Sequence, residues 1–151
     1  MIPPLDAYGL LPPGVWDCTL EEIDAAFGWN PHRKMLLANL RGFLAAEWVP
    51  LGIACPIYID GSFVRSKPLP SDIDLVLDLT AVTDLAPLGT AFAAVRLRHD
   101  ALKAAYTVDA WLRHPLIPHD LAAFFQYVGT KAAAELRLDT QHPKGILRMP
   151  P

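Results

Sequence analysis

The segment Asp72–Leu79, DIDLVLDL, limits the possible folds most strongly because its polar and apolar residues alternate. One face of an extended chain here would carry Ile73, Leu75, Leu77 and Leu79. A period of two is the pattern of a β-strand that buries one face. The same alternation puts Asp72 and Asp74 on the opposite face. The segment therefore predicts a strand that packs leucines on a core and begins with a pair of carboxylates.

Capping and turn residues divide the rest of the chain into helices and further strands. Thr19, followed three residues later by Glu22, forms the capping-box pattern of a helix start, and Gly28 is expected to end that helix. This order of helices and strands predicts a single small α+β domain. Further helices are expected over 31–49, 84–105 and 119–136, and further strands over 57–60, 106–113 and 145–149.

Prolines are concentrated near the two ends of the chain, which has fifteen of them in 151 residues. We interpret the ends as extended segments lying on one domain that spans 1–151. The expected boundaries are a proline-rich N-terminal arm over about 1–18 and a short C-terminal tail over about 140–151.

The composition fits a packed domain and argues against several classes of protein. Hydrophobic residues make up 52% of the chain and charged residues 19%, which is not typical of disorder. The formal net charge of -3 provides no overall positive field for nucleic acid. The two cysteines suggest neither a disulfide framework nor a zinc site. No signal peptide or apolar run of the ~20 residues needed to span a bilayer is recognised, so a cytoplasmic protein is expected.

Asp72 and Asp74 are the first candidates for a metal site. Residues two apart in a strand point the same way, with Cα atoms ~6.6 Å apart, so both carboxylates can approach one divalent cation or a pair of them. Ligands that are all oxygen favour magnesium or manganese over zinc. The alternative is that both acids are solvated where a loop meets a strand.

The loop before this strand carries groups that suit a phosphate. Gly61 has no Cβ, so an anion can approach backbone N–H groups closely, and Ser62 adds a hydroxyl donor. Arg65 and Lys67 are candidates for clamping the outer phosphates of a nucleotide, or they are exposed loop residues. Lys144 is a weaker candidate, for which a solvated tail lysine is preferred. The aromatic residues Phe124, Phe125 and Tyr127 are interpreted as core or interface rather than as a base-stacking platform.

Asp109 is the third acid of interest because it lies within the apolar segment YTVDAWLR. A buried aspartate is costly unless it is paired, hydrogen-bonded or bound to metal. If its strand lies beside the one that begins at Asp72, all three acids meet, and Asp109 can also accept a proton from an attacking hydroxyl. The alternatives are a salt bridge to an arginine or a solvent-facing position on an edge strand.

Together these residues resemble the Gly-Ser…Asp-x-Asp signature of the nucleotidyltransferase superfamily, which includes DNA polymerase beta and the minimal nucleotidyltransferases. Gly61 and Ser62 match the first pair, Asp72 and Asp74 the paired acids, and Asp109 the acid on a later strand. Most of the chain is also similar to a little-characterised bacterial family of short nucleotidyltransferase-like proteins, through LPPGVWDCTLEEI, DGSFVRSKPLPSDIDLVL and KGILRM. The nine residues between Ser62 and Asp72 are one fewer than minimal nucleotidyltransferases usually have.

The resemblance implies a mixed β-sheet flanked by helices, Mg²⁺ or Mn²⁺, and a nucleoside triphosphate, with ATP expected first. The implied reaction transfers a nucleoside monophosphate to a hydroxyl acceptor and releases pyrophosphate. The implied catalytic and metal-binding residues are Asp72, Asp74 and Asp109. The implied nucleotide-binding residues are Gly61, Ser62, Arg65 and Lys67.

Two hypotheses about function follow from these residues. In the first, the protein is an active nucleotidyltransferase whose acceptor is a protein or a small molecule, because the chain is short and negatively charged. In the second, it is a catalytically inactive nucleotidyltransferase-like module that binds a partner protein, as in a toxin–antitoxin or phage-defence pair. The complete set of acids favours the first. A nucleic-acid-binding module is the weakest alternative, and a homo-oligomer remains open.

Overall fold

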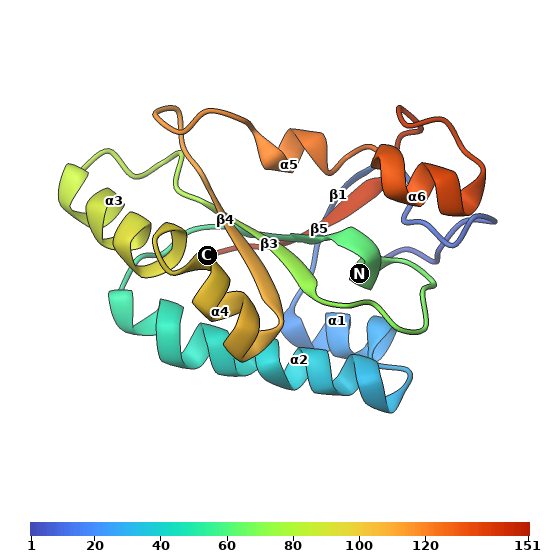
Figure 1. Cartoon of the computed structure of the whole chain (residues 1–151), viewed down its shortest axis with the longest axis horizontal. Coiled ribbons are helices and arrows are strands. Elements are labelled where there is room, and N and C mark those ends of the chain that lie inside the picture. Colours follow the sequence, from blue (N-terminus) through green and yellow to red (C-terminus); the bar gives the residue numbers. More distant parts are fainter.

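A five-stranded mixed sheet forms the centre of the computed structural model, which describes residues 1–151 (Figure 1). The strands are β1 (Gly14–Asp17), β2 (Ile57–Asp60), β3 (Ile73–Asp78), β4 (Val108–Arg113) and β5 (Gly145–Met149). Their order across the sheet is β1-β5-β2-β3-β4. Strand β2 pairs antiparallel with β3 and β5, whereas β1 runs parallel to β5 and β3 parallel to β4. The first and last strands of the chain therefore lie side by side.

Helices lie on both faces of this sheet, and the expected α+β class is confirmed. They are α1 (Leu20–Phe27), α2 (Pro31–Phe43), α3 (Leu85–Ala91), α4 (His99–Tyr106), α5 (Leu121–Phe124) and α6 (Gly129–Leu136). Helices α1 to α4 cover one face, and α5 and α6 lie over the other (Figure 1). No helix has the length and apolar character that crossing a membrane requires.

The main core lies between the sheet and helices α1 to α4. It includes the four residues predicted to share the buried face of β3: Ile73, Leu75, Leu77 and Leu79. Burying each such side chain stabilises the fold by roughly 1.5–3 kcal/mol. A slip of one residue would expose all four, so the core fixes which face of β3 carries the acids.

The helix boundaries predicted from capping residues are confirmed near the N-terminus. Thr19 accepts a hydrogen bond from the Glu22 N–H, and the Glu22 carboxylate accepts one from the Thr19 N–H. Gly28 is the C-cap of α1, and Pro31 is the first residue of α2. The helical path of α2 continues through a π-helical turn and a 3₁₀ turn to Leu51.

The prediction of one long helix over 119–136 is wrong, because the chain forms two short helices there, α5 and α6. Between α5 and α6, Tyr127 forms a β-bridge with Pro143, and the Val128 N–H donates to the His142 carbonyl. These contacts with a distant segment take backbone groups that a continuous helix would use internally. The expected helix over 84–105 is also interrupted: α3 and the π-helical turn after it end at Arg96, and α4 begins at His99.

Both ends of the chain contribute strands to the sheet, as expected over 145–149 but not for the N-terminal segment. The segment predicted as an arm ends in β1, and the predicted tail contains β5. Ile146 and Leu147 in β5 are fully buried, so this strand belongs to the interior of the sheet.

Candidate functional site

Aspartates form a row across three neighbouring strands. Asp74 of β3 lies opposite Asp60 of β2 on one side and opposite Asp109 of β4 on the other. Residues paired across strands point to the same face of a sheet, so the three carboxylates share the face that α1 to α4 leave open. Asp72 comes two residues before Asp74 and adds a fourth carboxylate at the same end of β3. We call Asp60, Asp72, Asp74 and Asp109 the acid cluster; it brings together the three acids expected from the sequence.

Asp74 has the most strongly perturbed carboxylate of the cluster. Its pKa is raised to about 7, first by burial and then by the negative charges of Asp72, Asp60 and Asp109. Lys103 offsets only part of this repulsion. A divalent cation would relieve it, because an opposite charge nearby favours the ionised form.

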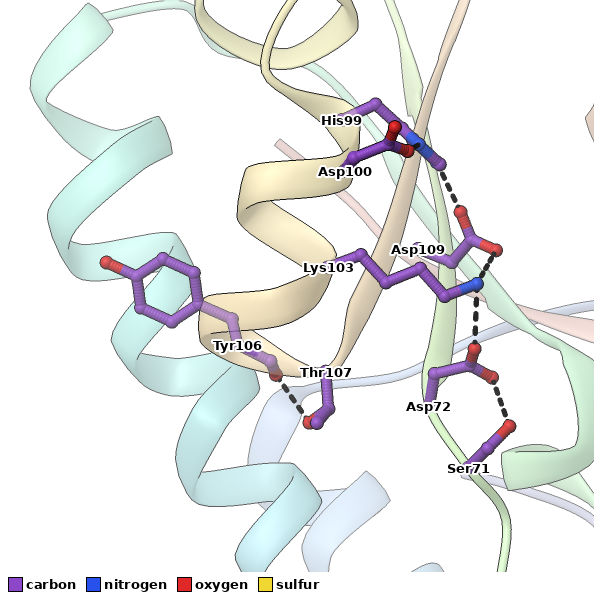
Figure 2. Close-up of polar contacts among 8 residues, drawn as sticks. All are labelled: Ser71, Asp72, His99, Asp100, Lys103, Tyr106, Thr107 and Asp109. Atoms are coloured by element: carbon purple, nitrogen blue, oxygen red, sulfur yellow. Dashed lines mark hydrogen bonds and ion pairs between the residues drawn. The ribbon is translucent and has the colours of Figure 1, made fainter.

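Two basic side chains from α4 reach the acid cluster, as Figure 2 shows. The ammonium of Lys103 lies 2.8 Å from Asp109 Oδ2 and 3.1 Å from Asp72 Oδ2. One helical turn earlier, His99 Nε2 lies 2.5 Å from Asp109 Oδ1. Both oxygens of Asp109 therefore have partners. Neither residue was among the candidates predicted from the sequence, although their spacing of four places them on one face of a helix that leads directly into β4.

The acid cluster suits a hard divalent cation in its chemistry but is not arranged as a finished metal site. All its donors are carboxylate oxygens on one face of the sheet, the ligands preferred by Mg²⁺ and Mn²⁺. No group of three or more acidic, histidine or cysteine side chains is placed to hold a metal ion, and Lys103 lies between Asp72 and Asp109. The predicted ligands therefore suit a hard cation by their chemistry, and Lys103 holds two of them in the structure.

Gly61 is required by the position of Asp74. It opens a 3₁₀ turn, Gly61–Val64, with φ +78°, a conformation that strains residues with a side chain. A Cβ at this position would lie 1.7 Å from Asp74 Oδ2. Gly61 was expected to let a phosphate approach the backbone; in the structure the space of its missing side chain holds the Asp74 carboxylate.

A cavity of about 430 Å³ opens beside the acid cluster. Gly61, Ser62, Asp72 and Asp74 line it from the sheet side, and Phe124, Phe125, Tyr127 and Lys131 line it from α5, α6 and the segment between them. Phe124 is 60% exposed and Tyr127 45% exposed. Phe124 and Tyr127 are therefore not core residues, and of the predicted core or interface roles only the interface remains for them.

Arg65 and Lys67 also line this cavity but are held by an acid from α6. The guanidinium of Arg65 lies 2.5 Å from Glu135, and the Lys67 ammonium lies 3.5 Å from the same carboxylate. Arg65 is buried, so it is not a free loop residue. Both basic side chains therefore form part of the cavity wall while they are paired with Glu135.

Lys144 and Asp60 form a buried ion pair at the edge of the cavity. Their charged atoms lie 2.5 Å apart, Asp60 is 2% exposed, and its Oδ2 has no partner. Burial raises the pKa of Asp60 to about 6, although the Lys144 charge opposes this shift. The interpretation of Lys144 as a solvated tail lysine is wrong. The sequence analysis also missed Asp60; its position at the end of an apolar strand, before Gly61, was the available signal.

Arg33 in α2 fixes the loop that carries the Gly-Ser pair. It is fully buried and donates to the carbonyls of Phe27, Phe63 and Lys67. Its guanidinium also lies over the Phe63 ring, 4.5 Å from the centroid. Burial lowers the pKa of Arg33 to about 10, which leaves it charged at neutral pH. Nothing in the local sequence distinguished this arginine from an exposed helix residue.

Comparison with known proteins places the chain in a family without assigning its activity. The chain belongs to DUF6932, described as a family of unknown function, which matches residues 3–150. No curated protein and no solved structure matches the chain.

Proposed function

We propose that this member of DUF6932 is a Mg²⁺- or Mn²⁺-dependent nucleotidyltransferase that transfers a nucleoside monophosphate from a triphosphate to a hydroxyl acceptor. The observation that carries the proposal is the row of like-charged carboxylates around Asp74, next to a cavity that begins at Gly61 and Ser62. Like charges directly opposite one another weaken a sheet. A chain that gathers them on one face is best explained by a cationic ligand.

The cavity has room and suitable groups for a nucleoside triphosphate, with ATP as the first substrate to test. Its volume of about 430 Å³ is within the usual range for small-molecule sites, ~300–1,000 Å³. The Gly61–Val64 turn and the Ser62 hydroxyl are assigned to the phosphates. The exposed rings of Phe124 and Tyr127 are assigned to the base, because aromatic side chains stack on nucleobases.

Three acids share one task in the proposed reaction, and one of them has a second. Asp72, Asp74 and Asp109 would hold the divalent cation, which when bound neutralises charge on the phosphates. Asp109 takes the proton of the acceptor hydroxyl, whose oxygen forms a new bond to the α-phosphorus. The bond from that phosphorus to the bridging oxygen of the β-phosphate breaks, and pyrophosphate leaves.

The acceptor is assigned to the class of proteins or small molecules. A net charge of -3 over 151 residues offers little attraction for a polynucleotide backbone.

A second candidate function has an observation in its favour. Lys103 already neutralises Asp72 and Asp109, as it would in a metal-free module that binds a partner protein, such as a toxin–antitoxin or phage-defence component. In that case no triphosphate binds and no group is transferred.

The two candidates are separated by incubating the protein with each α-labelled nucleoside triphosphate and Mg²⁺, with and without cell extract. We expect label on a specific acceptor, lost in Asp72→Asn and Asp74→Asn but retained in Asp78→Asn, whose carboxylate is paired elsewhere. Absence of transfer together with absence of calorimetric heat for every triphosphate would reject the enzyme and favour the binding module.

A further inference from the structure

Lys103 occupies the position between two proposed metal ligands. Its ammonium contacts Asp72 Oδ2 at 3.1 Å and Asp109 Oδ2 at 2.8 Å, and it is the one cation that bridges these two acids (Figure 2). Neither acid has another basic partner on that oxygen. In the metal-free site the ammonium therefore supplies the positive charge that a divalent cation would supply to Asp72 and Asp109 in the metal-bound site.

The side chain of Lys103 is built to leave this position. It exposes 42% of its side-chain surface, whereas Asp72 and Asp109 expose 16% and 14%. Its four-carbon stem carries several rotatable bonds, and a partly exposed ammonium is readily hydrated on turning outward. The acids, in contrast, are fixed by β3 and β4. An incoming cation can thus replace the ammonium without moving the sheet.

We propose that Lys103 is an internal counter-cation: it holds Asp72 and Asp109 in the metal-free protein, and a divalent cation must displace it to bind. The inference rests on the metal site of the proposed function, but it does not depend on any transfer reaction. It adds a regulatory contact to that site, because the charge of Lys103 and the charge of the metal compete for the same oxygens.

Displacement of Lys103 changes the partner of one oxygen of Asp109. While the ammonium is in place, Lys103 contacts Oδ2 and His99 contacts Oδ1. A divalent cation that takes the place of the ammonium binds at Oδ2, while His99 keeps its contact with Oδ1 and orients the carboxylate. His99 is thereby a positioning residue for Asp109.

The test measures binding of Mn²⁺ alone, by electron paramagnetic resonance and calorimetry, to the wild-type protein, Lys103→Met and Lys34→Met. Lys34 is exposed on α2 and serves as the matched control for loss of one positive charge. We expect Lys103→Met to bind Mn²⁺ about tenfold more tightly than wild type, since one competing contact of about 1.4 kcal/mol is removed. Lys34→Met should match wild type.

Thermal unfolding provides a second measurement that does not rely on the affinity. Without metal, Lys103→Met should melt below wild type, because Asp72 and Asp109 then lack a counter-charge; saturating Mn²⁺ should raise its Tm by more than that of wild type. Lys103→Arg keeps the charge and should bind Mn²⁺ no more tightly than wild type. Equal or weaker Mn²⁺ binding by Lys103→Met, in a protein that circular dichroism shows to be folded, would overturn the proposal.

The same data keep the two proposals apart. Tighter Mn²⁺ binding by Lys103→Met in a protein that transfers no label would support the counter-cation and reject the enzyme. Label transfer combined with unchanged Mn²⁺ affinity in Lys103→Met would support the enzyme and reject the counter-cation.

Discussion

The two ends of the β3–β4 ladder carry charged pairs of opposite kinds on the same face of the sheet. At one end Asp74 lies opposite Asp109, and at the other Asp78 lies opposite Arg113. The second pair is a salt bridge of 2.8 Å, and Thr80 donates two further hydrogen bonds to Asp78. The first pair repels, and Asp60 extends the row on the other side of Asp74.

This difference separates a charge that its neighbours satisfy from one that they do not. Burial by itself would raise the pKa of Asp78, but hydrogen bonds from Thr80 and Arg113 outweigh it and hold the pKa below its ordinary value. The pKa of Asp74 moves in the opposite direction, to about 7. Two aspartates four residues apart on one strand thus differ in whether their neighbours satisfy the charge.

The largest effect on stability is expected from removing Lys144, the buried cation that pairs with Asp60. Lys144→Met should lower the free energy of unfolding by about 3–5 kcal/mol, because it leaves Asp60 buried without a partner. Urea denaturation measures the change. The control Lys34→Met, on an exposed position, should lie within about 0.5 kcal/mol of wild type. Adding Asp60→Asn to Lys144→Met should recover part of the loss; no recovery would mean that Lys144 acts through packing alone.

Gly61→Ala should come next, with a loss of about 2–4 kcal/mol, since a left-handed backbone and a collision with Asp74 add together. Gly52→Ala is the matched control: Gly52 has φ +67° but nothing within 4 Å of an added Cβ, so backbone strain alone should cost about 1 kcal/mol. Asp74→Ala combined with Gly61→Ala should restore the steric part, as judged by denaturation. Equal losses at both glycines would show that the Gly61–Asp74 approach has no consequence.

The pH dependence of stability should reveal the raised pKa of Asp74. Because the unfolded Asp74 releases its proton near pH 4 and the folded one near pH 7, the folded state binds more protons in between, and stability should fall as pH rises through this interval. Asp74→Asn should lack this decline. The free energy of unfolding of wild type and of Asp74→Asn is measured by denaturation between pH 4.5 and 8. Asp60 is present in both proteins, so its titration contributes to both curves. A constant difference across this range would contradict the repulsion assigned to Asp74.

The smallest effect is expected at Asp78, which is paired with Arg113. Its contribution to stability should change with pH in the direction opposite to that of Asp74. Asp78→Asn should cost about 1 kcal/mol at neutral pH, since Arg113 retains Asp120 as a second partner. The folded pKa of Asp78 is depressed, so its contribution is present above the unfolded pKa near 4 and is lost as pH falls through the folded value. The difference between wild type and Asp78→Asn should therefore shrink below pH 4. A difference that grew on acidification would remove the contrast between Asp78 and Asp74.

The sequence predicted the local geometry of this site well. Alternation in β3 gave the correct faces for the leucines and the acids, and Thr19, Gly28 and Pro31 gave correct helix boundaries. These signals work because strand and helix periods follow from backbone geometry within a few residues. The prediction of one helix over 119–136 was wrong because its break is not a local effect: Tyr127 contacts Pro143, sixteen residues away.

The partners of the acids could not be read from the sequence in the same way. Lys103, His99, Lys144 and Asp60 reach the site through pairing of β2, β3, β4 and β5, and register between strands is set by packing of the whole core. Lys103 and His99 carried a local hint, because they share a helix face just before Asp109, and Asp60 carried one because it ends an apolar strand before Gly61.

By itself, the sequence determined that Asp72 and Asp74 share a face of one strand, that Gly61 and Ser62 precede it in a turn, and that the chain forms an α+β domain. The tertiary structure decided that Asp60, Asp74 and Asp109 lie in register and that Lys103 bridges two of the acids. The reason is that side-chain direction follows from local backbone periodicity, whereas the neighbour of each carboxylate depends on which strands and helices the core brings together.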